Sequence, residues 1–187
     1  LTWPVRGCSS RLGREPSLSQ DAVSITVSEE VRQSVAAGHP AVALESTIFT
    51  HGLPRPRNVE VAWDAERRLR EQGVTPATIG VVDGVPTVGL SEDQIERLCH
   101  DDDAVKVSVR ELPITAAKRG NGGTTVAATS FLARQAGLRV FSTGGLGGVH
   151  HGAEHTFDES ADLAALASTP IAVVSSGVKS ILDISAT

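Results

Sequence analysis

Short apolar runs alternate with segments of helical periodicity along most of this chain. The run over residues 41–44 has no polar alternation, which is typical of a strand buried on both faces of a parallel sheet. Similar runs predict strands at 77–82, 104–107, 138–141 and 171–174. We therefore expect a sheet whose strands are largely covered on both sides.

Helix signals separate these strands. Apolar positions at helical spacing predict a helix over 58–72, which Gly73 ends. Ser91 and Gln94 form a capping-box pattern for another helix. Further helices are expected at 28–35, from the segment 121–125 to residue 136, at 162–167, and from about Lys179 onward. Strands alternating with helices predict an α/β fold with a mainly parallel central sheet and helices on both faces.

Turn signals complete this outline. Asp83-Gly84 separates the strand at 77–82 from a second apolar segment at 86–90, so a small β-hairpin is expected. The prolines within 51–57 predict a loop there. Residues 1–30 include a polar stretch without period and are expected to be a poorly ordered leader, whereas 31–187 form one α/β domain.

Composition excludes several classes of function. A net charge of −5 with 3% aromatic residues and no Tyr argues against a nucleic-acid-binding surface. No apolar stretch approaches the ~18 residues that a membrane span needs. The two cysteines, Cys8 and Cys99, form no CxxC pair, which suits a reducing compartment. We therefore expect a cytoplasmic protein with neither a nucleic-acid partner nor a membrane anchor.

Charged residues follow or interrupt the predicted strands. Glu45 follows the run 41–44, Lys106 lies within 104–107, and Lys179 lies shortly after 171–174. Ligands of parallel sheets bind at the carboxyl ends of the strands, so these side chains are expected to converge. Partial burial would lower the pKa of Lys179 and make it a usable nucleophile. On the pattern alone, a surface lysine at a helix start is the favoured interpretation of Lys179.

Two glycine-rich segments are candidate phosphate sites. The loop 144–148 follows a predicted strand, and its backbone N–H groups could approach an anion, although an ordinary tight turn is the alternative. The segment 121–125 lies at a predicted helix start, where the helix dipole favours anions, and simple capping is the alternative.

Acidic and histidine residues follow the glycine loop 144–148. The segment 151–155 matches H-x-x-E-H, so a zinc peptidase is a possible class, which requires one helix across both histidines. Asp158 and Asp162 flank Ser160 and Ala161; they either decorate a helix start or hold a hard divalent cation beside a phosphate.

Many separate motifs resemble those of the pseudouridine-5′-phosphate glycosidase family, and they are collinear from about residue 40 to the last residue. The motifs are Ala43-Leu44-Glu45-Ser46-Thr47-Ile48, His51-Gly52, Lys106-Val107-Ser108, Gly123-Thr124-Thr125-Val126, Thr143 to His150, Thr156-Phe157-Asp158, Ser160-Ala161-Asp162-Leu163, and Gly177-Val178-Lys179-Ser180. Members of this family continue beyond the position of Ile184, so the domain is expected to be an incomplete, C-terminally truncated version.

The resemblance implies a reaction and its catalytic residues. The family reversibly cleaves the C–C glycosidic bond of pseudouridine 5′-phosphate to uracil and ribose 5-phosphate. By motif, Lys179 is the nucleophile that forms a Schiff base with the opened ribose, and Glu45 carries the proton that opens the ring. Asp158 holds Mn²⁺, although oxygen ligands also accept Mg²⁺.

The resemblance also implies substrate contacts and assembly. Lys106, Val126, His150 and the segment Ser160, Ala161 and Asp162 would contact the phosphorylated nucleoside. Family members form homo-oligomers, commonly trimers. The alternative from another class is a non-catalytic fragment that binds sugar phosphates but lacks the segment needed for turnover.

Overall fold

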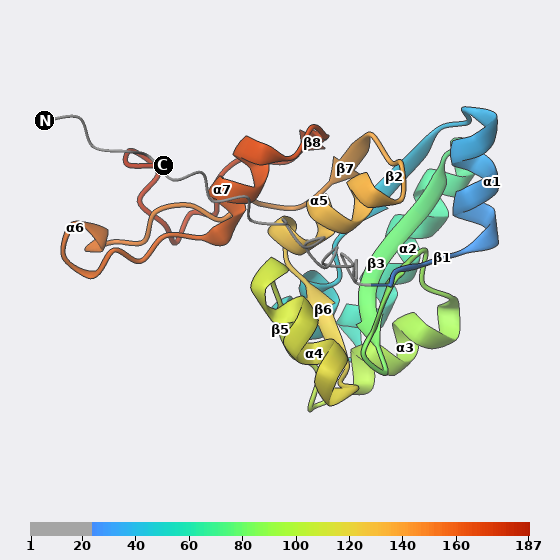
Figure 1. The fold of residues 1–187 in the computed structure, drawn as a ribbon, viewed down its shortest axis with the longest axis horizontal. Helices are drawn as coiled ribbons and strands as arrows, with labels where there is room; N and C mark the ends of the chain where they lie inside the picture. Colours follow the sequence, from blue (N-terminus) through green and yellow to red (C-terminus); the bar gives the residue numbers. More distant parts are fainter. Residues whose placement is uncertain (1–23) are drawn as a thin grey trace, which may run out of the picture.

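A computed structural model describes residues 24–187 of the chain, and its strands belong to one sheet (Figure 1). The strands are β1 (Thr26–Val27), β2 (Ala41–Leu44), β3 (Thr75–Val82), β4 (Val85–Val88), β5 (Val105–Val107), β6 (Gly122–Thr124), β7 (Val140–Ser142) and β8 (Ala172–Val174). The helices are α1 (Glu29–Ala37), α2 (Arg57–Glu71), α3 (Glu92–His100), α4 (Leu112–Lys118), α5 (Val126–Gln135), α6 (Ala153–Thr156) and α7 (Ala161–Ser168).

The sheet is mixed but mostly parallel, as the sequence predicts. Its main path runs β1-β4-β3-β2-β7-β8, and β6 branches from β3 and carries β5. Neighbouring strands are parallel except where β3 meets β4 and β6. The β3–β4 pair is the expected hairpin, whose turn has positive φ at Asp83 and Gly84. The carboxyl ends of β2, β7 and β8 therefore lie at one edge.

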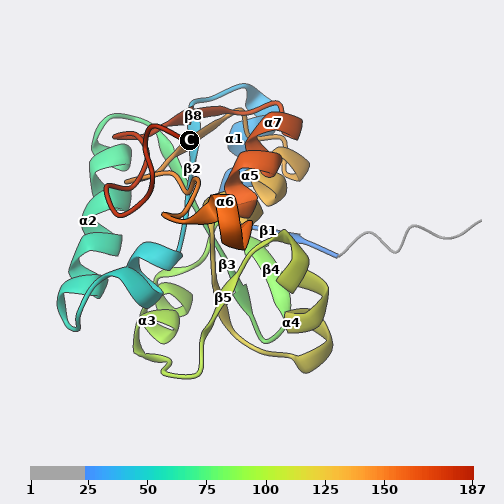
Figure 2. The same cartoon turned by 90° about the vertical axis from the view of Figure 1, so that its left-hand side faces the viewer.

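Helices cover both faces of the sheet, which confirms the predicted fold class. Figure 2 shows α2 and α5 on opposite sides of β2. On the α5 side, Val31 of α1 and Leu132 of α5 pack with Phe141 of β7 in one buried cluster. On the α2 side, Val59 and Ala62 pack with residues of α3 in a second cluster. Within residues 24–187, no helix is both long and apolar enough to cross a membrane.

Local sequence signals explain most helix boundaries. Ser28 accepts a hydrogen bond from the Val31 N–H at the start of α1. Ser91 and Gln94 form the expected reciprocal capping box at α3. Gly73 follows α2 with φ +73°, a left-handed conformation that favours glycine. The predicted helices at 28–35, 58–72 and 162–167 correspond to α1, α2 and α7.

Several expectations are corrected. Residues 122–124 form β6 rather than the start of a helix, and α5 begins only at Val126. The strand at 104–107 was expected to be buried, but Val105 and Lys106 of β5 are exposed because β5 is an edge strand. The segment 51–57 is not wholly loop, since a π-helical turn, Ile48–Gly52, includes its first two residues.

The segment after Lys179 forms no helix. Val178 instead makes an isolated parallel bridge with Leu146, and turns follow. Of the expected leader at 1–30, residues 1–23 lie outside the described residues, whereas Thr26–Val27 form β1 and Glu29 begins α1. Trp63 has the spacing of a core position on α2, yet its side chain is 42% exposed.

The buried face of α5 should dominate stability. Leu132 is fully buried in the cluster that joins α1, α5 and β7. We expect Leu132→Ala to lower the free energy of unfolding by about 2–5 kcal/mol, because it removes buried methyl groups and leaves a cavity. Ile114→Ala on α4, where the side chain is 50% exposed, should change it by less than about 1 kcal/mol. Urea unfolding of both variants measures the difference, and equal losses would contradict this packing.

Candidate functional site

The register of three parallel strands determines where the candidate site lies. Leu44 of β2 pairs with Ser142 of β7, and Ser142 pairs with Val174 of β8. The residues that follow these strand ends therefore share one edge, as expected for a ligand site in a parallel sheet. The Thr143 N–H continues the pairing by donating to the Val174 carbonyl at 3.0 Å.

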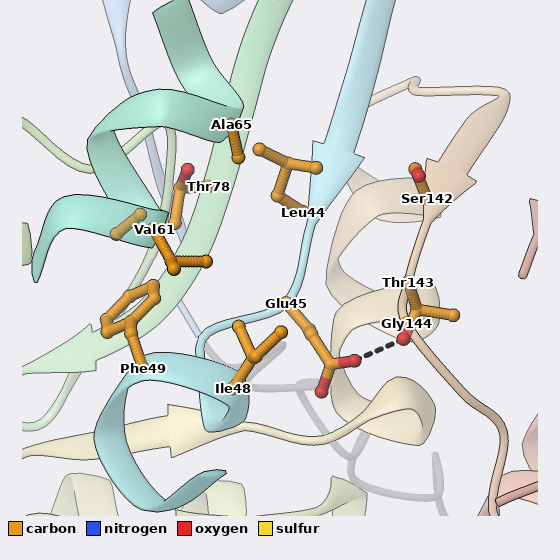
Figure 3. Close-up of a pocket in the computed structure, with 11 residues that line it drawn as sticks. Leu44, Glu45, Ile48, Phe49, Val61, Ala65, Thr78, Ser142, Thr143 and Gly144 are labelled. Carbon is orange, nitrogen blue, oxygen red and sulfur yellow. Dashed lines mark hydrogen bonds between the residues drawn. The ribbon is translucent and has the colours of Figure 1, made fainter. Parts of the chain in front are cut away.

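Glu45 is the buried carboxylate of this edge. Its side chain follows β2, and the residue is only 8% exposed. The hydroxyl of Thr143 donates to Oε1 and the hydroxyl of Thr47 donates to Oε2 (Figure 3 draws the Thr143 bond). Two hydroxyl donors compensate part of the cost of burying the carboxylate and fix its orientation. Sequence reasoning identified Glu45 but missed both threonines.

Glu45 lines two adjoining cavities. The first, here called the apolar pocket, has a volume of about 290 Å³ and lies between β2, β7 and α2 (Figure 3). Leu44, Ile48, Phe49 and Val61 form much of its apolar wall. The second, here called the lysine pocket, has a volume of about 600 Å³ and is lined by both Lys106 and Lys179. A buried carboxylate and two amines thus face one cavity.

A third cavity is lined by all of the predicted substrate contacts. This Val126 pocket has a volume of about 260 Å³ and shares Thr47, Lys106 and Lys179 with the lysine pocket. Its lining includes all six residues to which the resemblance assigns substrate binding, namely Lys106, Val126, His150, Ser160, Ala161 and Asp162. Residues spread over more than fifty positions therefore meet in one place.

Lys179 is held through its backbone to the glycine loop 144–148. Its N–H donates to the Leu146 carbonyl at 3.0 Å, and the Leu146 N–H donates to the Gly177 carbonyl at 2.9 Å. The lysine side chain is exposed in the described structure. The partial burial expected for this amine is therefore absent from the structure of residues 24–187.

Lys106 reaches the site from the branch of the sheet. It lies on β5 opposite Gly123 of β6, and the Thr124 N–H donates to Ser46 Oγ at 2.7 Å just after β2. This buried hydrogen bond connects the end of β6 to the strand end that carries Glu45. Lys106 is exposed rather than covered within its strand, yet it lines the cavity at which the charged side chains were expected to converge.

His51 is a site residue that sequence reasoning left without a role. It lines the lysine pocket, and Thr50 Oγ1 lies 2.7 Å from its Nδ1. Burial, and then the positive charge of Lys106, lower the pKa of the imidazole. The histidine is therefore expected to be mostly neutral near pH 7. Its position directly after the Glu45 segment was the available signal.

The two candidate phosphate loops are partly occupied by protein groups. The Gly147 N–H donates to Asp162 Oδ2 at 2.9 Å, and the Ala127 N–H at the start of α5 donates to Asp162 Oδ1 at 2.9 Å. Thr125 caps the same helix by accepting from the Ala128 N–H. Capping by side chains thus accounts for much of the α5 terminus, where an external anion was one of two alternatives.

Asp158 lines none of these three cavities but lies beside His150, which lines the Val126 pocket. The His150 N–H donates to the Asp158 carbonyl at 3.1 Å, and the Asp158 Oδ2 atom lies 3.8 Å from His150 Nδ1. Both side chains are exposed. No group of three or more metal-ligating side chains occurs among residues 24–187. A divalent ion here would have one carboxylate and otherwise water or substrate oxygens, a set that Mn²⁺ and Mg²⁺ accept.

The H-x-x-E-H segment lacks the geometry of a zinc peptidase. The helix α6 begins at Ala153, after Gly152 in a left-handed conformation with φ +83°. His151 therefore lies outside the helix that carries Glu154 and His155. The required helix across both histidines is not formed.

The fold and site define the class of protein: an α/β protein with a cavity at the carboxyl ends of parallel strands, lined by a buried carboxylate and two lysines. Residues 30–187 match the family model described as Indigoidine synthase A like protein, and the chain belongs to that family.

Two curated relatives confirm the resemblance noted from the motifs. The chain is 69% identical over 161 residues to a protein named pseudouridine-5′-phosphate glycosidase from Saccharopolyspora erythraea, covering 86% of this chain and 53% of the relative. The protein of the same name from Frankia alni is 59% identical over 164 residues, with 88% and 45% covered. The chain spans about half the length of these relatives.

Two solved structures share the fold. A crystal structure of the prealnumycin C-glycosynthase AlnA in complex with ribulose 5-phosphate has a TM-score of 0.78 and 41% identity, covering 86% of this chain and 52% of that one. An indigoidine synthase A-like protein from Thermotoga maritima has a TM-score of 0.79 and 42% identity, covering 88% and 53%.

The proximity of Lys106 and His51 gives a testable pH effect. Replacing Lys106 by Gln removes a positive charge that disfavours the imidazolium, so the pKa of His51 should rise, while the contribution of burial remains. Titration of the imidazole by NMR measures the shift. Lys118→Gln, at the C-terminal end of α4, is the matched control and should leave the pKa of His51 unchanged. Equal shifts in both variants would contradict the proximity of Lys106 and His51.

Proposed function

We propose that this chain contributes the catalytic carboxylate and lysine of an enzyme that reversibly cleaves the C–C glycosidic bond of pseudouridine 5′-phosphate, giving uracil and ribose 5-phosphate. The observation that carries the proposal is the meeting of Glu45, Lys106 and Lys179 at one cavity. The names of the curated relatives and the ribulose 5-phosphate complex of the C-glycosynthase support the substrate class.

The chemistry of the bond explains why a lysine is needed. The bond to be broken joins C1′ of ribose to a carbon of uracil, so there is no leaving heteroatom for an acid to protonate, as in ordinary glycosidases. An amine at C1′ supplies an electron sink and divides one difficult cleavage into easier steps. Lys179 would provide that amine, with Lys106 as the neighbouring cation.

The reaction would pass through a covalent bond between the Lys179 amine and C1′. The Lys179 amine bonds to C1′ as O4′ leaves, taking the proton that Glu45 carries. The C1′–C5 bond then breaks, its electron pair goes to C5 of uracil, which takes a proton, and the nitrogen forms an imine with C1′. One water hydrolyses the imine and releases ribose 5-phosphate. The hydroxyls of Thr47 and Thr143 would hold Glu45 in position throughout.

Binding of the substrate is assigned to the Val126 pocket. Lys106, Val126, His150, Ser160 and Ala161 line this cavity beside Lys179, so they are the proposed contacts for the phosphorylated ribose. Holding the sugar there would place C1′ within reach of the amine, which is the main rate advantage of such a site.

Metal and assembly are further parts of the proposal. Asp158 would hold one Mn²⁺ or Mg²⁺ ion, with His150 next to it, and the ion would supply positive charge beside the phosphate. The whole enzyme is proposed to be a cytoplasmic homo-oligomer, a trimer by family resemblance.

A second candidate is binding without turnover. Lys179 is exposed, and the chain spans about half of its relatives, so the described residues could bind a sugar phosphate without the burial that activates the amine. This candidate predicts affinity for ribose 5-phosphate but no imine.

Imine trapping separates the two candidates. Incubation with ribose 5-phosphate, Mn²⁺ and borohydride should give a reduced ribose-phosphate adduct that peptide mapping places on Lys179. Lys179→Gln should abolish the adduct, whereas the Lys118→Gln variant, changed at the C-terminal end of α4, should still form it. Binding of ribose 5-phosphate without an adduct would select the binding-only candidate, and an adduct on another lysine would remove Lys179 from the mechanism.

A further inference from the structure

Asp162 stands out among the residues of the Val126 pocket because its carboxylate binds two segments of the protein. The residue is only 5% exposed. Its Oδ1 accepts from the Ala127 N–H and its Oδ2 from the Gly147 N–H, both at 2.9 Å. Charge-assisted bonds from buried amides are among the stronger hydrogen bonds in proteins. Each carboxylate oxygen is therefore already engaged by backbone.

The first partner is the start of α5. Ala127 lies in the first turn, directly after Val126, which lines the cavity. The first N–H groups of a helix lack partners within it and carry partial positive charge, so a carboxylate there is stabilising. The Asp162 carboxylate, on α7, accepts such a bond from the start of α5. Ser160 is the N-cap of α7, and its hydroxyl accepts from the Asp162 N–H.

The second partner is the glycine loop that holds the nucleophile. Gly147 precedes Gly148 and follows Leu146, whose backbone forms hydrogen bonds with Gly177 and Lys179. A Cβ at Gly147 would collide with Ser160 Oγ and Asp162 Oδ2. The close approach of loop and carboxylate thus requires glycine at this position.

We infer that Asp162 is a positioning residue: its carboxylate ties the glycine loop to the start of α5 and so places Lys179 against the Val126 pocket. The resemblance alone implied that Asp162 contacts the substrate. The geometry instead assigns its carboxylate to the backbone on either side of the substrate. This inference rests on the proposed function only in naming Lys179 as the group that is placed.

Asp162→Asn is the sharpest test, because asparagine has nearly the same size and shape as aspartate. Its side chain offers one acceptor oxygen instead of two, so one of the two backbone N–H donors would face an amide NH₂ group. Hydrogen exchange of peptides covering 144–148 and 177–180 should accelerate by at least about tenfold, while α1 keeps its protection. Asp93→Asn, an exposed acid in the first turn of α3, changes net charge equally and should leave both peptides unchanged. Unchanged exchange in the Asp162 variant would overturn the inference.

A second readout separates positioning from general stability. Imine trapping at Lys179 is measured with ribose 5-phosphate and with glycolaldehyde, which is too small to need the Val126 pocket. The ratio of the two trapping rates should fall by at least about tenfold in Asp162→Asn and stay constant in Asp93→Asn. An unchanged ratio in Asp162→Asn would mean that the carboxylate does not position Lys179.

The remaining outcomes are also decisive. If the wild-type chain forms an imine with neither ribose 5-phosphate nor glycolaldehyde, the proposed function fails for this chain. Hydrogen exchange alone then tests whether Asp162 holds the glycine loop 144–148 in place. If Asp162→Asn unfolds, through-hydrogen-bond scalar couplings in the wild type decide it. Couplings from the Gly147 and Ala127 nitrogens to the Asp162 carboxylate carbon are expected, and their absence would overturn the inference.

Discussion

The parallel pairing of β2, β7 and β8 is the constraint on which the site depends. Leu44, Ser142 and Val174 lie in register, so the chain leaves all three strands at the same level. Because successive residues of a strand point to opposite faces, a slip of one residue would move Glu45 away from Thr143. The buried apolar side chains that fix this register, such as Ala43 and Phe141, therefore also fix the geometry of the site.

The polar groups at this edge differ in their degree of burial, and that difference suits different roles. Glu45 is buried and oriented by two hydroxyl donors, an environment that suits the role of proton carrier proposed for it. Lys106 and Lys179 remain exposed beside the cavity, and Asp162 is buried with both oxygens bound to backbone. The two lysines thus line both the lysine pocket, which Glu45 also lines, and the Val126 pocket, which Asp162 also lines.

The sequence predicted the parts of the fold that local patterns encode. Continuous apolar runs marked β2, β3, β7 and β8, and the capping box at Ser91 marked α3, because these signals depend on neighbouring residues only. β6 escaped prediction since Gly122 and Gly123 have no strand preference. Glycine is required at both positions, because a Cβ at Gly122 would collide with Val107 and a Cβ at Gly123 would collide with Thr50.

Long-range contacts account for what sequence reasoning missed at the site. The convergence of Glu45 with Lys106 and Lys179 followed from the rule for strand ends, and family resemblance supplied their roles. The hydrogen bond from Thr143 to Glu45 joins residues 98 positions apart, and the bond from Ala127 to Asp162 joins residues 35 positions apart. No local sequence pattern predicts either bond. The helix expected after Gly177 was wrong because the backbone there pairs with the glycine loop at Leu146 instead.

The most direct test of the account is a crystal structure of the chain soaked with ribose 5-phosphate. The account predicts density for the sugar phosphate in the space shared by the lysine and Val126 pockets, with C1′ next to the Lys179 amine and the sugar facing Glu45. Ordered sugar phosphate bound elsewhere on the molecule, with that space filled only by water, would contradict it.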